Sequence, residues 1–351
     1  MKRRIAMAVL SASVMSAGLM NPAGAQAPAA NKVFRFVPHA NLAVLDPIWT
    51  TAYVTRNHAY MIYDTLFSED AQGQIKPQMV DTYETSRDGK TWSFKLRAGL
   101  EFHDGKPVTS EDVVASLKRW TSRDAMGGIL ATFIERYETP DANTFKLVLK
   151  EPCGIVLDAL GKASSNVPFI MPARIAATPG TEQIKEHIGS GPFIFKADEF
   201  KPGSVAVYER NTKYVSRSEA PSGLAGGRPV NFDRVEWVII RDPQTQFNAL
   251  LAGEVDVLEQ PSFEQYDTLK KTAGVKMEDF TPAGFQYIMR FNHIQPPFNN
   301  PKIRQAAMLA IGQQAFISTQ VGVPELGRLC RSIYPCSSPF ADQTHPGFTG
   351  V

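Results

Sequence analysis

The most constraining feature of the sequence is an alternating segment that leads directly into a capped helix. Across residues 91–97 apolar and polar side chains alternate, which places Trp92, Phe94 and Leu96 on one face. This period of two predicts a half-buried β-strand, and the Asp-Gly pair at residues 88–89 is typical of a hairpin turn before it. The chain therefore needs a sheet with one face on a hydrophobic core.

A helix is predicted after a second Asp-Gly turn at residues 104–105. Thr109 can cap this helix, and the acidic side chains of Glu111 and Asp112 in its first turn favour the helix dipole. Three apolar side chains recur at helical spacing and predict the buried stripe: Val113, Leu117 and Trp120.

Similar patterns recur along the rest of the chain. Strands are predicted at residues 33–37, 143–150, 233–241 and 255–258, and helices at residues 53–66, at residues 243–252 and from residue 300 onward. The run 233–258 predicts a strand-helix-strand crossover in a mixed sheet. In the last helix the residues predicted to face inward are Ile303, Ala306, Ala307, Ala310 and Ile311. The fold class is α/β, with a mixed α+β lobe.

Length and charge limit the organisation and the partners. A chain of 351 residues favours two lobes over a single core. Its 37 basic and 35 acidic side chains nearly cancel, whereas nucleic-acid binding needs a concentrated basic face. Nucleic acid is therefore excluded as a partner, and the protein is expected to act as a monomer.

The first 25 residues have the pattern of a cleaved signal peptide. Lys2, Arg3 and Arg4 precede a short apolar stretch over residues 5–20, and residues 23–25 supply a small-x-small cleavage pattern. The alternative is a membrane anchor, but the apolar stretch contains serines and a glycine and is shorter than the ~20 residues a span requires. We expect export and a periplasmic location.

The cysteines agree with an oxidising compartment. Cys330 and Cys336 are spaced for a small disulfide loop, and no further ligands nearby indicate a metal site. Cys153 is expected to be a small buried apolar residue.

No catalytic pattern emerges from the histidines and serines. The six histidines contain no His-Glu-x-x-His motif, and no Gly-x-Ser-x-Gly elbow or Ser-x-x-Lys motif occurs. His103-Asp104 precedes a capped helix and is interpreted as structural, and Gly189-Ser190-Gly191 as a turn that enters a strand. The sequence predicts a protein that is not an enzyme and has no cofactor or metal.

Five segments, in order along the chain, resemble the family 5 bacterial extracellular solute-binding proteins, the peptide-binding components of ABC importers. The first combines YDTL at residues 63–66 with WSFKLRAGLEFHDGKPVTSEDVVAS at residues 92–116. The others are GSGPF at residues 189–193, NTKY at 211–214, ALLAGEVD at 249–256, and FN at 291–292 with PFNNPKIRQA at 297–306. The resemblance implies a type II periplasmic binding protein fold, with two lobes and a hinge near Asn292.

The resemblance also implies a division of the chain. Residues 1–25 are the signal peptide, residues 31–292 form domain I with an α+β subdomain at about 70–187, and residues 293–351 begin domain II. The family's second domain continues further, so an incomplete second lobe is expected, with exposed apolar faces that favour aggregation or poor binding.

Ligand-contacting residues are expected where similar proteins line their cleft. The loop after the first strand supplies Trp49, Thr50, Thr51 and Tyr53, although Trp49 and Tyr53 could equally belong to an interdomain core. Weaker candidates are Met126, Gly284 and Phe285, where neighbouring glycines would let the backbone approach a ligand.

The expected function is capture of a short peptide or a related small solute between the lobes and delivery to an inner-membrane ABC permease. Two alternatives remain open. A secreted hydrolase would turn over an ester or amide, and a chaperone-like or signalling protein would reuse the fold without a permease partner.

Overall fold

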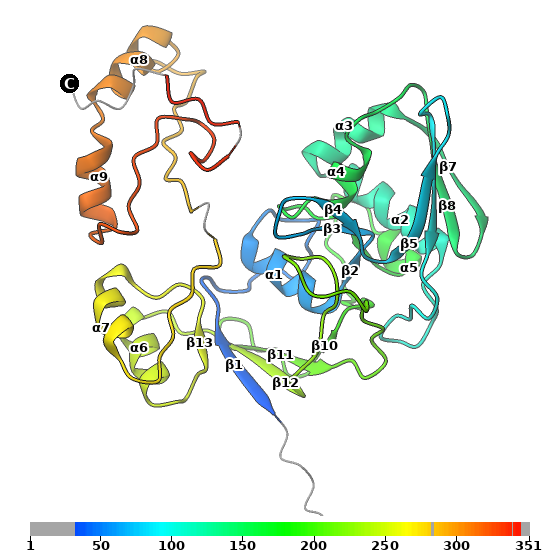
Figure 1. Ribbon diagram of the computed structural model, residues 1–351, viewed down its shortest axis with the longest axis horizontal. Helices are drawn as coiled ribbons and strands as arrows, with labels where there is room; N and C mark the ends of the chain where they lie inside the picture. Colours follow the sequence, from blue (N-terminus) through cyan, green and yellow to red (C-terminus); the bar gives the residue numbers. More distant parts are fainter. Residues whose placement is uncertain (1–31, 282–283, 339, 345–351) are drawn as a thin grey trace, which may run out of the picture.

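A five-stranded mixed sheet connects the beginning of the described chain with residues more than 200 positions later (Figure 1). The structure is a computed structural model that describes residues 32–281, 284–338 and 340–344. The strand order is β10 (Phe193–Phe195), β11 (Val205–Arg210), β12 (Arg234–Val238), β1 (Val33–Val37) and β13 (Val257–Leu258). The predicted signal peptide lies outside the described residues.

The predicted strand-helix-strand crossover is confirmed. Strands β12 and β13 both pair in parallel with β1, one on each side, and helix α6 (Pro243–Leu251) connects them. Asp242 caps α6, and Gly253 follows it with a φ of +71°, a conformation that glycine adopts without strain. The strands are shorter than predicted, because pairing with β1 ends before the apolar patterns do.

A four-stranded antiparallel sheet is the second large sheet of the structure. Its order is β5 (Val80–Thr85), β6 (Thr91–Leu96), β8 (Thr144–Leu149) and β7 (Ile134–Asp141). The predicted hairpin and both predicted strands are therefore confirmed. Helix α2 (Ser110–Thr121) packs on this sheet, and its capping box is present, with Thr109 and Asp112 bonding each other's backbone amides.

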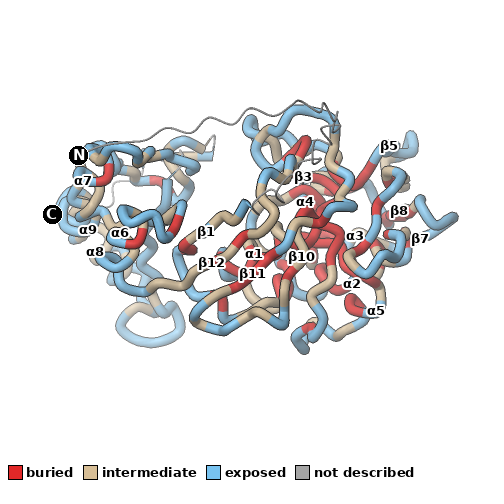
Figure 2. The backbone as a smooth tube through the Cα atoms, turned by 90° about the horizontal axis from the view of Figure 1, so that it is seen from below, coloured by how far each residue is buried: buried red, intermediate tan, exposed pale blue. Residues whose placement is uncertain are grey.

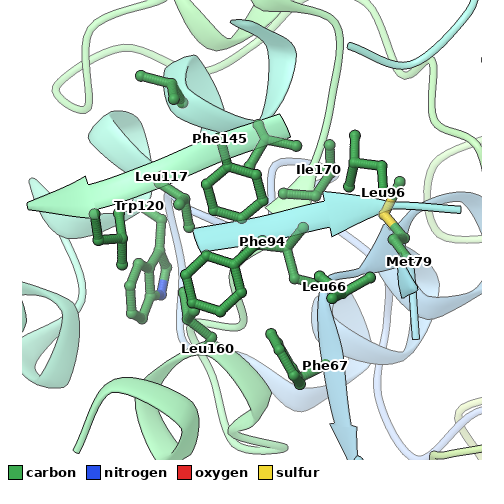
Figure 3. Packing of buried hydrophobic residues seen from close by; sticks show 14 of the residues in the cluster. Leu66, Phe67, Met79, Phe94, Leu96, Leu117, Trp120, Phe145, Leu160 and Ile170 are labelled. Carbon is green, nitrogen blue, oxygen red and sulfur yellow. The ribbon is translucent and has the colours of Figure 1, made fainter. Parts of the chain in front are cut away.

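Aromatic side chains on the inner face of this sheet form the centre of the largest hydrophobic cluster (Figure 3). The rings of Phe94 and Phe145 stack with centroids 4.8 Å apart, and both side chains are fully buried. The predicted stripe of α2 joins the same cluster, with Trp120 at its end. The alternation of β6 and the helical period of α2 thus converge on one core, and Cys153 is buried in it as predicted.

Shorter elements complete this part of the chain, which we call the first lobe (residues 32–271). Two small pairs join β2 (Asp64–Thr65) to β9 (Phe169–Ile170) and β3 (Phe67–Glu69) to β4 (Ile75–Pro77). The remaining helices are α1 (Tyr53–Ile62), α3 (Ala125–Phe133), α4 (Val156–Gly161), α5 (Ala173–Ala176), the 3₁₀ turn η1 (Phe263–Gln265) and α7 (Tyr266–Lys271).

The predicted helix at residues 53–66 is too long, because α1 ends at Ile62. The carbonyl of Ile62 accepts a hydrogen bond of 3.0 Å from the amide of Gly191, and residues 64–65 pair with β9. A Cβ atom at Gly189 would lie 1.8 Å from the oxygen of Ile62, so only glycine fits there. Tertiary contacts end the helix, and the interpretation of residues 189–191 as a structural turn is confirmed.

Two further helices, α8 (Pro301–Ala310) and α9 (Gln313–Gln320), lie away from the four-stranded sheet (Figures 1 and 2). We call residues 284–338 and 340–344 the distal segment. Figure 2 shows that buried residues gather in the first lobe, whereas α8 and α9 are intermediate or exposed. An exposed ion pair of 2.7 Å between Lys270 and Glu325 links α7 to the distal segment.

The predicted start of α8 is confirmed, but its predicted inward face is wrong for the described residues. Asn300 caps the helix and Pro301 occupies its first position. None of its residues is buried, and Ile303 is 39% exposed, because the described residues do not cover that face. The other residues that were predicted to face inward are also exposed or half-buried: Ala306, Ala307, Ala310 and Ile311.

A disulfide closes a small loop in the distal segment. It joins Cys330 and Cys336, whose Cα atoms are 5.7 Å apart. The side chain of Gln313 on α9 bonds both the amide and the carbonyl of Cys330, so this loop is tied to the helix. Across the described part of the chain, each helix is too short or too polar to cross a membrane.

Helix α1 brings a fully buried histidine into the first lobe. The Nδ1 atom of His58 lies 2.8 Å from the hydroxyl of Tyr208 on β11, and the edge of the ring meets Phe195. Burial, reinforced by the charge of His187, lowers the pKa of His58 from 6.5 to about 3. The folded protein therefore holds His58 neutral at a pH where an exposed histidine is protonated.

Acid is expected to destabilise the fold through His58. Between pH 6.5 and about 3 the unfolded chain binds one more proton at this residue than the folded chain does. As the pH falls through this range, the free energy of unfolding should decrease by ~1.4 kcal/mol for each pH unit because of this residue alone. Urea denaturation at pH 7.5, 6.0 and 5.0 should show a shallower pH dependence for His58→Phe, whereas the exposed control His293→Gln should follow the wild type. Parallel profiles for His58→Phe and wild type would contradict this assignment.

Candidate ligand-binding surface

A buried ion pair anchors the loop between β1 and α1. Asp46 accepts hydrogen bonds of 3.1 and 2.7 Å from the two terminal nitrogens of Arg119 on α2. Both side chains are only 1% exposed. The pair is bidentate, the geometry in which a guanidinium and a carboxylate bind most specifically. The loop is therefore attached at its first residue to the core of the first lobe.

The remaining groups of this ion pair also have partners. The carboxylate of Asp46 accepts from the backbone amides of Ile48 and Ile184, each at 3.0 Å. Arg119 donates to the carbonyls of Thr178 and Glu182, also at 3.0 Å. Because a buried pair stabilises a fold only when its other donors and acceptors are satisfied, this arrangement holds a single loop conformation.

Asn166 supports the same loop from a second direction. Its side-chain amide donates to the carbonyls of Pro47 and Thr50, each at 2.7 Å, and more weakly to that of Ile48 at 3.3 Å. Its own backbone carbonyl accepts from the indole of Trp120 at 2.9 Å. One buried side chain thus satisfies three loop carbonyls that would otherwise lack partners.

The braced loop presents the residues that the sequence predicted to contact ligand. Trp49 and Thr50 are half-buried, Thr51 is exposed, and Tyr53 at the start of α1 is 45% exposed. No side chain caps the first amides of α1 at Ala52. The loop therefore presents Trp49, Thr50, Thr51 and Tyr53 beside the uncapped start of α1, and these residues combine aromatic rings with hydroxyls.

Guanidinium groups lie over both aromatic rings of this loop. Arg56 lies 4.2 Å from the ring centroid of Tyr53, and Arg123 lies 5.4 Å from that of Trp49. These are cation–π distances, and the contacts limit the motion of both rings. We call Trp49, Thr50, Thr51, Tyr53, Arg56 and Arg123 the candidate surface.

An acidic residue borders the candidate surface where the chain leaves β13. Glu259 accepts from the backbone amide and the ring nitrogen of His39, both at 2.8 Å, and from the side chain of Asn57 at 3.0 Å. Burial alone would raise the pKa of Glu259, but the hydrogen bonds from His39 and the charge of Arg56 outweigh it, so the pKa is lowered. Glu259 is therefore ionised and already bonded.

The weaker candidates lie elsewhere. Met126 on α3 packs against the hydrophobic cluster of the four-stranded sheet. Gly284, with a φ of +77°, and Phe285, 69% exposed, belong to the segment that leads toward α8. Among the described residues no hydrogen bond, ion pair or ring contact joins these three to the loop, and their ligand contacts stay predictions.

His103 has a structural role, as predicted from its position before the capped helix. Its Nε2 atom lies 3.2 Å from the carbonyl of Gly191, and its Nδ1 atom accepts from the amide of Gly189. Burial lowers the pKa of His103 to about 4. Among the described residues no three His, Cys, Asp or Glu side chains gather as metal ligands.

A separate hollow of about 540 Å³ lies beside α2, between Lys118, Tyr137 and Gly180. None of residues 49–53 lines it. Volume alone would favour this hollow, but the candidate surface has the braced aromatic and polar groups that recognition needs. We therefore place the candidate site on the loop.

Sequence reasoning missed the residues that support the loop. Arg119 and Asn166 follow Asp46 in the sequence by 73 and 120 residues, and no local pattern links the three. Arg123 and Arg56 were missed as well, because a single arginine near a helix end is ordinary. The Asp-Pro pair at residues 46–47 was the available signal for a fixed loop.

Removing the side chain of Asn166 should loosen the loop. We expect Asn166→Ala to lower the free energy of unfolding by roughly 1–3 kcal/mol, since it leaves buried carbonyls without donors. Amide hydrogen exchange of residues 48–51 should accelerate well beyond the change in global stability. Asn143→Ala, in the exposed turn between β7 and β8, is the matched control and should alter neither quantity. Unchanged exchange at residues 48–51 in Asn166→Ala would show that Asn166 does not brace the loop.

The sequence and fold are similar to a group of known proteins. Residues 74–342 match the bacterial extracellular solute-binding proteins, family 5 Middle. A probable peptide ABC transporter periplasmic-binding protein from Sinorhizobium fredii is 41% identical over 92% of this chain and 60% of its own length. A glutathione-binding protein from Escherichia coli K12 is 27% identical over 79% of this chain and 52% of its own.

Solved structures show the same fold. The binding protein AgaA from A. tumefaciens R10, in complex with agropinic acid, is 27% identical with a TM-score of 0.65 over 83% of this chain and 56% of its own. The Helicobacter pylori protein DppA, in complex with the peptide STSA, is 20% identical with a TM-score of 0.73 over 91% of this chain and 65% of its own. The predicted fold class, a mixed α/β protein of the type II periplasmic binding class, is confirmed. The chain spans 60% of the first of these curated relatives and 52% of the second.

Proposed function

The chain belongs to the family 5 bacterial extracellular solute-binding proteins, and on that premise we propose that it is a periplasmic receptor for short peptides or a related small solute. It delivers the ligand to an inner-membrane ABC permease and acts as a monomer without a cofactor. The observation that carries this proposal is the braced loop, which exposes Thr51 and Tyr53 beside the uncapped start of α1.

The ligands of similar proteins support this substrate class. The Sinorhizobium fredii relative is described as a probable peptide transporter component, and the Escherichia coli relative as glutathione-binding. AgaA was solved with agropinic acid. These ligands are small and polar, and a surface with aromatic rings and hydroxyls beside the uncapped start of α1 suits them.

Binding proceeds by closure of two lobes around the ligand. The first lobe offers a rigid surface, the second lobe approaches it about a hinge near Asn292, and the ligand stabilises the closed state because only there does it contact both sides. The signal-peptide pattern of residues 1–25 supports export to the periplasm. The division at residues 292–293 belongs to this proposal.

A receptor differs from the two alternatives in what it does to its ligand. A hydrolase would need an activated nucleophile or a metal, and the histidine of the His103-Asp104 pair is bonded to backbone groups. A chaperone-like protein would favour unfolded chains over short peptides. We propose that the protein returns its ligand unchanged, which mass spectrometry of a recovered peptide would test.

Short peptides should bind through the candidate surface. In calorimetric titrations with di- to pentapeptides and glutathione, at least one should bind to the 351-residue chain. Tyr53→Ser should weaken that binding by about tenfold or more, since it removes an exposed aromatic contact. Tyr83→Ser, at a similarly exposed tyrosine on β5, is the control and should bind as the wild type does. Absence of binding by every peptide, or cleavage of a peptide during the titration, would refute the proposed receptor function.

A further inference from the structure

Most of the charged side chains near the candidate surface form ion pairs or hydrogen bonds within the first lobe. Asp46 is paired with Arg119, and Asp124 lies 2.5 Å from the ammonium of Lys162. Glu259 is bonded to His39 and Asn57. The carboxylates around the loop therefore have partners before any ligand arrives, and a ligand cation would find no free acidic side chain among them.

Arg123 differs from the neighbouring cations. It lies just beyond the end of α2 and is exposed, and no carboxylate oxygen of the described residues lies within 4.0 Å of its guanidinium nitrogens. Among the described residues, the one hydrogen bond of its guanidinium, to the carbonyl of Trp49, is long at 3.4 Å. A guanidinium carries five N–H donors, so most of those of Arg123 are available to a ligand.

The position of Arg123 is nevertheless defined. Its guanidinium lies over the ring of Trp49, whose backbone belongs to the braced loop. On another side, a Cβ atom at Gly180 would come within 2.9 Å of the Cγ atom of Arg123, so the aliphatic stem packs closely against glycine backbone. A cation held in this way loses less conformational freedom on binding than an ordinary surface arginine.

Arg56, the other guanidinium of the candidate surface, is less available. Its nitrogens donate to the side chain of Asn57 at 2.9 and 3.2 Å and to the carbonyl of Ala163 at 3.3 Å. The charge of Arg56 also acts on Glu259. It is therefore committed to the structure around the loop, which leaves Arg123 as the group that can accept a new anionic partner.

We propose that Arg123, positioned by Trp49, recognises a carboxylate of the ligand and makes the receptor selective for anionic solutes. This assignment rests on the proposed function and adds the residue that determines specificity. The planar guanidinium suits bidentate binding of a carboxylate, and a lysine at this position would keep the charge but lose the stacking and the fork.

Matched pairs of ligands test the assignment. Calorimetry would compare leucyl-leucine with leucyl-leucinamide, which lacks only the terminal carboxylate, at low and high salt. The wild type should bind the acid more tightly by about 10- to 100-fold, as expected for a charge-assisted hydrogen bond, and salt should reduce this preference.

Variants separate recognition from folding. Arg123→Gln should lose the preference for the acid over the amide, and its melting temperature should remain that of the wild type. Arg123→Lys should keep a small part of the preference, and Trp49→Phe should keep more of it than Trp49→Leu. Arg87→Gln, at an exposed arginine in the β5–β6 turn, changes the net charge equally and should behave as the wild type.

Each result bears on a different claim. Equal binding of acid and amide by the wild type, or an unchanged preference in Arg123→Gln, would overturn the role of Arg123 and leave the receptor function standing. Failure of both ligands and of all the other peptides to bind would overturn the receptor function, and the assignment with it.

Discussion

The buried ion pair between Asp46 and Arg119 is the interaction on which the candidate surface depends. It connects the loop after β1 to helix α2, and both side chains are almost completely removed from solvent. A charge in such a place is tolerated only with a full set of partners, and backbone groups of residues 48, 178, 182 and 184 supply them. The pair therefore specifies one loop conformation, whatever its net contribution to stability.

One side of the loop is held in place by hydrogen bonds, and the other side exposes side chains that a ligand can contact. Behind it, Asn166 and Asp46 occupy the backbone groups of residues 47–50. In front of it, Thr51, Tyr53 and Arg123 remain exposed. Such a division suits a receptor, because a preformed surface loses little entropy when a ligand binds, while the free groups supply the new contacts. A mobile loop with the same side chains would bind more weakly.

The first lobe and the distal segment differ in how well they are packed. Aromatic clusters fill the first lobe, whereas α8 and α9 contain no buried residue in the described structure (Figure 2). Proteins that close around a ligand need one surface to stay fixed while another moves. The firm packing of the first lobe is what the fixed side of the proposed closure would require.

Local patterns determined much of this protein without any tertiary information. The alternation around Phe94, the capping box at Thr109 and the helix start at Asn300 predicted their elements, since each depends on side chains a few residues apart. The resemblance to the family, and not a local pattern, marked Trp49, Thr50, Thr51 and Tyr53 as expected ligand contacts. Tertiary structure decided the rest: α1 ends at Ile62 because glycines 189 and 191 pack against its backbone. It also brought Arg119, Asn166 and Arg123 to the loop, because burial and charge pairing act between residues that are close in space at any separation along the chain.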